Sequence, residues 1–111
     1  MTNEKIIHMP IKYIKGHIFV QIDGELWLID TGSPGSFGAS GSLVIGDERV
    51  ALDISYNNLA AETLSQFVGV PCVGLLGMDI LGRFDLVFDV ADGKLTISTE
   101  NLQTYTLKLS T

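Results

Sequence analysis

The sequence predicts a mostly β domain that contains one helix of middle length. Three observations predict this class: 12 of the 111 residues are glycine, short apolar runs alternate with turn signals, and only one stretch has helical periodicity. A chain of this length, in which 46% of the residues are hydrophobic, is large enough for one modest core. We therefore expect residues 1–111 to form a single domain.

The N-terminal part predicts three strands. Lys5 to Met9 reads as a short strand that Pro10 ends, and residues 17–22 read as a second strand. Asp23-Gly24 is a hairpin signal because both residue types tolerate positive φ. The return strand, Leu26 to Ile29, is apolar at every position, which indicates a strand buried on both faces.

The middle of the chain predicts a loop and then a hairpin. Residues 33–42 have the glycine and serine content of a loop, with Phe37 as its only large anchor. Residues 43–45 and 49–54 then read as two strands joined around Gly46-Asp47-Glu48.

Residues 58–68 predict the one convincing helix. Its apolar face is expected to contain Ala60, Leu64, Phe67 and Val68. Asn57 or Asn58 is expected to cap its start, and Gly69 followed by Pro71 is expected to end it.

The C-terminal part predicts a buried strand, a helical turn and three more strands. The buried strand covers residues 72–77, and residues 78–83 form the helical turn. The strands are expected at Phe84 to Val90, at Leu95 and Ile97 after an Asp92-Gly93 turn, and at Tyr105, Leu107 and Leu109.

The charge and composition exclude several classes of function. A net charge of −6 with seven basic residues disfavours binding to nucleic acid, which needs clustered Lys and Arg, and binding to an anionic membrane. The single cysteine, Cys72, excludes an intrachain disulfide. The chain starts without a signal-peptide pattern and has no apolar run near the ~20 residues of a membrane span. We expect a cytoplasmic protein.

The strongest chemical signal is Asp30-Thr31-Gly32-Ser33, which follows the apolar residues 26–29. A second element, Leu75-Leu76-Gly77-Met78-Asp79-Ile80-Leu81, follows about half a domain later. With these two elements the chain resembles the retropepsin-like aspartic proteases of bacterial type, the single-lobe relatives of pepsin. The hairpin at 17–29 and the segment from Phe84 to Leu95 are similar to that family as well.

The resemblance implies a closed β-barrel, the acid-protease half-lobe, that works as a homodimer. It implies that Asp30 is the catalytic carboxylate, that Gly32 lets the backbone turn beside it, and that Thr31 joins the two loops at the dimer axis. Ser33 would hydrogen-bond the outer oxygen of the Asp30 carboxylate and contact the substrate. The chain has no second Asp-Thr/Ser-Gly motif, so the partner copy must supply the second carboxylate across an isologous interface. Terminal strands at 5–9 and 104–109 are candidates for interleaving across it.

The implied function is that of an aspartic endopeptidase. Two carboxylates about 3 Å apart cannot both ionise, so they share one proton. The ionised member takes a proton from water, and the protonated member donates to the scissile carbonyl. This chemistry needs a peptide or protein substrate but no metal and no organic cofactor.

Two departures from the family pattern leave alternatives open: the usual ion pair is missing, and residues 34–42 are rich in glycine and serine where the family has an apolar strand. Pro34 and Met78 stand where the family usually has an ion pair. The hairpin at 42–54, with an acidic tip, is the best candidate for the flap that covers the substrate. The alternatives are a catalytically inactive retropepsin-like module that dimerises or binds peptides, and an unrelated small β-barrel in which Asp30 is structural.

The remaining polar residues have structural interpretations. His8 and His17 stand singly and are expected on strand faces, and Cys72 is expected to be an inert core thiol. Asp85 and Asp89 are expected on a solvated outer face. Trp27 is expected to pack in the core, and the glycine-rich loop lacks the lysine of a phosphate-binding loop.

Overall fold

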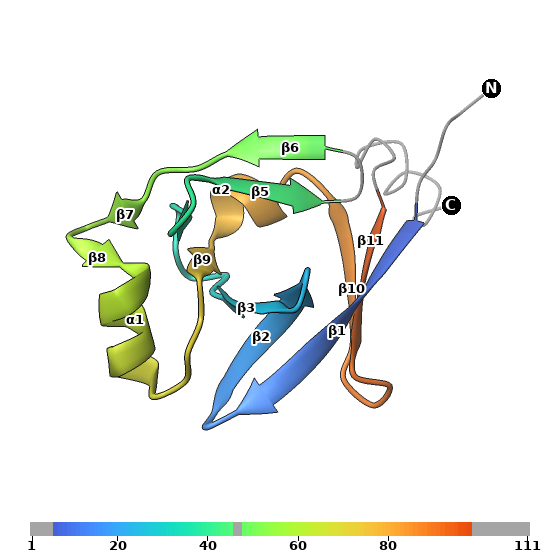
Figure 1. Ribbon diagram of the computed structural model, residues 1–111. Coiled ribbons are helices and arrows are strands. Elements are labelled where there is room, and N and C mark those ends of the chain that lie inside the picture. Colours follow the sequence, from blue (N-terminus) through green and yellow to red (C-terminus); the bar gives the residue numbers. More distant parts are fainter. Residues whose placement is uncertain (1–5, 46–47, 99–111) are drawn as a thin grey trace.

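A computed structural model describes residues 6–45 and 48–98 of the chain. The mostly β class predicted from the sequence is confirmed, and the chain forms a compact body with α1 on one side and β10 and β11 on the other (Figure 1). The strands are β1 (Ile6–Ile14), β2 (His17–Ile22), β3 (Glu25–Ile29), β4 (Phe37–Gly38), β5 (Ser42–Ile45), β6 (Glu48–Ala51), β7 (Ser55–Tyr56), β8 (Leu59–Ala60), β9 (Gly74–Leu76), β10 (Asp85–Asp89) and β11 (Lys94–Ser98). The helices are α1 (Ala61–Val68) and the single turn α2 (Met78–Leu81).

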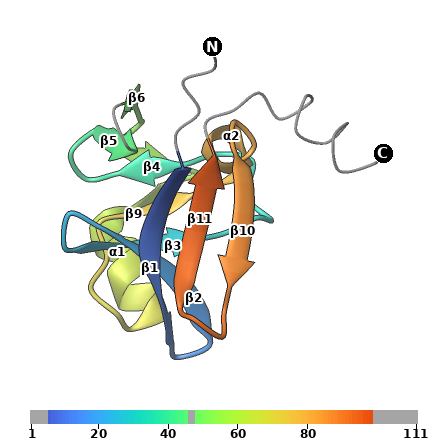
Figure 2. The same cartoon turned by 90° about the vertical axis from the view of Figure 1, so that its right-hand side faces the viewer.

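Seven strands form the main sheet in the order β10-β11-β1-β2-β3-β9-β4. All neighbours are antiparallel except β3 and β9, which run parallel. The strands β5 and β6 form a separate hairpin, as predicted, and β7 and β8 form another. Figure 2 shows β10, β11 and β1 side by side, with the β5–β6 hairpin on the opposite side of β4 from β10.

The strand β3 is buried on both faces, as its composition predicts. Trp27 belongs to a core cluster with residues of β2, β5, β6, β11 and α2. Leu28 belongs to a second cluster that includes Leu64 and Val68 of α1. Neighbouring side chains of a strand point to opposite faces of the sheet, so β3 lies between the two clusters. Any residue that follows β3 therefore starts from a rigidly held position.

The predicted turn at Asp23-Gly24 is confirmed, with φ angles of 52° and 79°. The strand end predicted at Pro10 is wrong, because β1 continues to Ile14. β1 pairs with β11 up to Pro10 and with β2 from Ile11 onward. Ile11 donates its N–H to Gly93 on the β11 side. Successive N–H groups of a strand point alternately to its two sides, so an N–H at Pro10 would point toward β2. Pro10 is not paired with β2, and its lack of an N–H therefore costs no ladder bond.

The predicted start of the helix is also wrong. Asn57 and Asn58 do not cap it but form the β7–β8 turn, with φ angles of 53° and 63°. Asn tolerates this left-handed conformation, and α1 begins only at Ala61, after an N-cap residue, Ala60, that makes no side-chain cap bond. The predicted C-terminal glycine is confirmed, since Gly69 has φ 76° and donates to the carbonyl of Ser65.

One residue of the predicted apolar helix face lies on the wrong side. Leu64 and Val68 are buried, but Phe67 is 84% exposed. Phe67 precedes Val68 by one residue, and the ~100° step of a helix turns it away from the cluster that Val68 enters. Helical spacing alone therefore overestimated the width of the buried face.

The predicted loop at 33–42 contains the short strand β4, and its expected anchor, Phe37, is 1% exposed. The strands predicted around residue 75, at 84–90 and at Leu95 and Ile97 are present as β9, β10 and β11. Val90 lies beyond the end of β10 and is exposed. The hairpin tip at 46–47 and the strand predicted at 104–109 lie outside the described residues. No helix of the described part of the chain is both long and apolar enough to cross a membrane.

Candidate functional site

Asp30 lies directly after the last residue of β3. Its backbone N–H donates to the carbonyl of Leu76 on β9 at 3.0 Å, which extends the pairing of the two parallel strands by one bond. The N–H of Ser33 then donates to the carbonyl of Asp30 at 3.1 Å and closes a turn. Thr31 and Gly32 at the tip of this turn are exposed, and Asp30 is half-buried. The motif is thus presented at the surface by a buried strand.

The carboxylate of Asp30 has one hydrogen-bond partner among the described residues. The N–H of Gly32 donates to Oδ1 at 3.0 Å. The hydroxyl of Ser33 donates to the carbonyl of Gly35 at 2.8 Å, and not to Asp30 as the resemblance implies. A carboxylate has about four acceptor positions, so Asp30 keeps acceptor capacity for a water, a proton or another chain.

The second predicted element, residues 75–81, contacts the backbone of this turn. Met78 donates its N–H to the carbonyl of Ser33 at 2.7 Å. A Cβ atom added to Gly77 would lie 2.5 Å from the carbonyl oxygens of both Ser33 and Gly35. Two backbones approach so closely here only because residue 77 has no side chain. The two elements that the sequence singled out are therefore in contact.

A polar network that sequence reasoning missed joins the two elements. The hydroxyl of Ser36 donates to Oδ1 of Asp79, and the N–H of Ser36 donates to Oδ2 of the same carboxylate at 3.2 Å. The Ser36 hydroxyl also accepts the N–H of Gly77 at 2.7 Å. Ser36 is 4% exposed, so these bonds are made largely out of water. They hold the segment after the motif on α2.

Pro34 and Met78 lie together at this end of the molecule. The carbonyl of Pro34 accepts the N–H of Asp79 at 3.2 Å, which places Pro34 beside the start of α2. Pro34 is exposed, and Met78 is 46% exposed. The surface next to the Asp-Thr-Gly turn is therefore apolar at these two positions.

A hollow of about 300 Å³ lies on the other side of the turn. It is lined by Ile29 and Thr31, by Gly16 of the β1–β2 turn, by His17 and Ile18 of β2, and by Phe88 of β10. This hollow places the tip of the turn next to the edge strand β10.

The hairpin predicted as a flap lies elsewhere. Leu43, Ile45 and Val50 of β5 and β6 are buried in the core cluster that contains Trp27. The hairpin also shares a cleft with Ile22 to Glu25 of the β2–β3 turn. That turn precedes β3, whereas Asp30 follows it, and five residues of strand separate the two ends by about 16 Å. The described part of the hairpin, 42–45 and 48–51, therefore flanks the start of β3 and lies away from the end that carries Asp30.

The other polar candidates contact residues of the same fold and do not gather at Asp30. Nδ1 of His8 is 2.9 Å from the Thr96 hydroxyl oxygen, and His17 packs edge-on against Phe19 at a centroid distance of 6.4 Å. The sequence predicts Asp85 and Asp89 on a solvated face, but both are half-buried. Asp89 accepts the N–H of Asp92 at 3.0 Å. Across the described ranges, no three His, Cys, Asp or Glu side chains gather where they could hold a metal ion.

The environments of Cys72 and Trp27 agree with structural roles. Cys72 is buried, and this burial raises the pKa of its thiol, although a contact with the Ser65 hydroxyl opposes the shift. Trp27 packs against Gly38 and Gly74, where an added Cβ would lie 2.5 Å from the indole ring.

Comparisons of the chain with models of protein families, with curated protein sequences and with solved structures found no match.

Proposed function

We propose that the protein is an aspartic endopeptidase of retropepsin-like fold that acts as a homodimer. The observation that carries the proposal is the position of Asp30: it ends a strand buried on both faces, is only half-buried itself, and has one hydrogen-bond donor. The contact between the Asp30 turn and residues 77–79 adds support, because the resemblance to the family rests on these same two elements. The closed half-lobe barrel is part of this proposal.

In the proposed reaction, the Asp30 carboxylates of two copies share one proton. The ionised carboxylate removes a proton from water, whose oxygen attacks the peptide carbonyl carbon. The protonated carboxylate donates its proton to the carbonyl oxygen, which gives a neutral tetrahedral intermediate. The carboxyl group that took the proton from water then gives it to the amide nitrogen, while the other carboxylate removes a proton from a hydroxyl of the intermediate. The C–N bond breaks, a carboxylic acid and an amine are released, and the pair again holds one proton.

Dimerisation through the Asp30 turn is supported by the exposure of this surface. Thr31 and Gly32 project from the protomer, and exposed Pro34 and Met78 add apolar area beside them. A two-fold axis at the turn would bring each residue against or near its own copy. Because Pro34 and Met78 carry no charge, we expect this contact to depend little on salt concentration.

A second candidate function is a catalytically inactive module of the same fold that dimerises or binds peptides. The position of the β5–β6 hairpin favours this candidate, because within the described residues it flanks the start of β3 and leaves Asp30 uncovered. A protease without a lid loses the exclusion of water and the substrate contacts that a closing lid provides.

The test combines oligomeric state with proteolysis. Sedimentation velocity at micromolar concentration should give a dimer, and incubation with denatured casein between pH 3 and pH 7 should give fragments by mass spectrometry. The same preparation of Asp30→Asn should remain a folded dimer and give none. A dimer without cleavage would support the inactive module. A monomer at all concentrations would reject the homodimeric protease and the dimerising module, and would leave only a module that binds peptides as a monomer.

A further inference from the structure

A groove lies beside the start of β3, at the opposite end of this strand from Asp30. It has a volume of about 860 Å³ and lies between α1, the β2–β3 turn and the segment that leads into β9. Its lining includes the apolar residues Leu26, Val70, Pro71 and Val73, and most of the lining surface is apolar.

The groove is open where the chain leaves α1, because the first residue after the helix has no side chain and the next one is buried. Gly69 takes a left-handed conformation with φ 76° and ends the helix, and Val70 then turns into the core. Pro71 is exposed and cannot donate a backbone hydrogen bond. Leu64 and Val68 face the core cluster, so α1 presents Glu62, Ser65 and Gln66 to the groove.

The backbone at the floor of the groove is already hydrogen-bonded. The N–H of Val73 donates to the carbonyl of Leu26 at 2.9 Å, and the N–H of Cys72 donates to the Ser65 hydroxyl at 3.0 Å. The Ser65 hydroxyl in turn lies 2.9 Å from the carbonyl of Cys72. A partner therefore cannot bind here by adding a strand through main-chain bonds. Recognition must come from side chains that enter the apolar groove and from charges at its rim.

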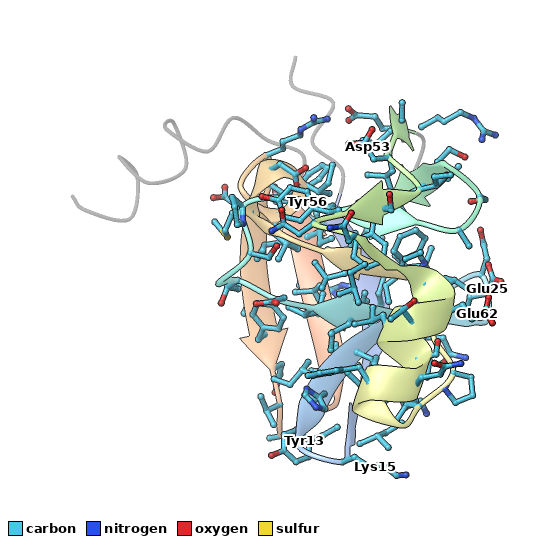
Figure 3. The ribbon with its side chains drawn as sticks, turned by 90° about the vertical axis from the view of Figure 1, so that its left-hand side faces the viewer. Tyr13, Lys15, Glu25, Asp53, Tyr56 and Glu62 are labelled. Carbon is cyan, nitrogen blue, oxygen red and sulfur yellow. The ribbon has the colours of Figure 1, made fainter. Side chains whose placement is uncertain are left out.

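The charged residues that line the groove are both acidic. Glu25 on β3 and Glu62 on α1 are both exposed and both line the groove, while none of the lining residues is Lys or Arg. Figure 3 shows these two glutamates on the same side of the molecule beside α1, with Lys15 away from them at the β1–β2 turn. Lys15 approaches Gly69, which also lines the groove, so one cation lies beside the groove at the C-terminal end of α1. The rim is therefore acidic between Glu25 and Glu62, at the other end of the helix.

We propose that this groove docks a segment of another protein in which an apolar residue is flanked by Lys or Arg. The apolar side chain would fill the groove, and the basic side chains would pair with Glu25 and Glu62. The aliphatic stems of Lys and Arg would also cover part of the apolar lining. An acidic segment is repelled by the same two carboxylates. The docking site does not depend on whether Asp30 is catalytic.

The probe is a fluorescein-labelled peptide Gly-Leu-Lys-Val-Arg-Gly, followed by fluorescence anisotropy in low salt. A matched peptide with glutamate in place of both basic residues should bind at least tenfold more weakly. Replacing both rim charges in Glu25→Gln/Glu62→Gln should weaken binding of the basic peptide about fivefold, as expected for two exposed ion pairs. Gln66→Trp, which fills the groove from an exposed helix position, should weaken it further.

The matched control is Glu48→Gln/Asp92→Asn, which changes the net charge by the same two units at exposed positions outside the groove. It should bind the basic peptide like the wild type, and all variants should keep the wild-type melting temperature. Equal weakening in the two double variants would show a general charge effect and overturn the proposal. The proposal would also be overturned if the wild type bound the acidic peptide as tightly as the basic one. It would be overturned as well if Gln66→Trp bound the basic peptide as tightly as the wild type does.

Discussion

Asp30 and Asp79 lie on two segments that are hydrogen-bonded to each other, but their carboxylates have different surroundings. Asp79 accepts two bonds from Ser36, and its own backbone N–H is bound to Pro34. Asp30 accepts one bond, from Gly32 two residues away. The carboxylate of Asp79 joins distant parts of the chain, whereas the carboxylate of Asp30 is held only by a residue of its own turn.

This difference separates a structural acid from a candidate catalytic acid. A carboxylate that accepts hydrogen bonds from a distant part of the chain, as Asp79 does, loses those bonds when it is replaced. A carboxylate with spare acceptor positions can exchange protons with a water or a substrate without disturbing the fold. We therefore expect substitutions at Asp30 to change activity, and substitutions around Asp79 to change stability.

The largest expected effect is that of Asp30→Asn on proteolysis. The asparagine Oδ1 can still accept from Gly32, but the side chain can no longer remove or supply the required proton, so kcat should fall at least about 10³-fold. The free energy of unfolding should change by less than about 0.5 kcal/mol. Casein cleavage and urea unfolding of the same samples measure both quantities. An active Asp30→Asn enzyme would remove Asp30 from the mechanism.

The next largest effect is expected at Gly77, where the two segments cross. The new Cβ of Gly77→Ala would lie 2.5 Å from two backbone carbonyl oxygens, which cannot move as a flexible side chain can. Overpacking of this kind should lower the free energy of unfolding by about 3 kcal/mol. Gly32→Ala is the matched control, because its Cβ would meet only Oδ1 of Asp30 at 3.3 Å. Urea unfolding that gives equal losses for the two variants would contradict the close crossing.

A smaller loss of stability is expected for Ser36→Ala. It removes the hydroxyl that binds Asp79 and leaves the N–H of Gly77 without its acceptor, which should cost about 2 kcal/mol. Asp79→Ala should cost less, because its carboxylate lies at a residue exposed to water. In a double-mutant cycle the two losses should add to more than the loss of the double variant. Additive losses would show that the Ser36–Asp79 bond does not couple the two segments.

The features that the sequence predicted well are set by neighbouring residues. Asp23-Gly24 forms its turn because both residues accept positive φ, and Gly69 ends α1 for the same reason. The Asp30 turn could be placed because an entirely apolar strand precedes it. In each case the deciding interaction spans only a few residues.

The features that were missed depend on residues far apart in the chain. Ser36 and Asp79 are 43 positions apart, so no local pattern could pair them. The only signal was an acid in the first turn of a predicted helical segment. Pro10 remained in a strand because β1 changes its partner at that residue. Phe67 was misplaced because the width of a buried helix face depends on what packs against it.

The smallest expected effect is that of Ser33→Ala, and it tests how far Asp30 is independent of its neighbours. In the protomer the Ser33 hydroxyl binds Gly35, so its loss should cost about 0.5–1 kcal/mol of stability and leave the kcat of proteolysis unchanged. Urea unfolding and casein cleavage of the same samples measure both quantities. If the hydroxyl instead turns to Asp30 when two copies meet, its removal takes a hydrogen bond from the catalytic carboxylate, and kcat would fall more than the small loss of stability explains. Such a fall would show that Asp30 acquires, in the dimer, a side-chain partner that it lacks in the single chain.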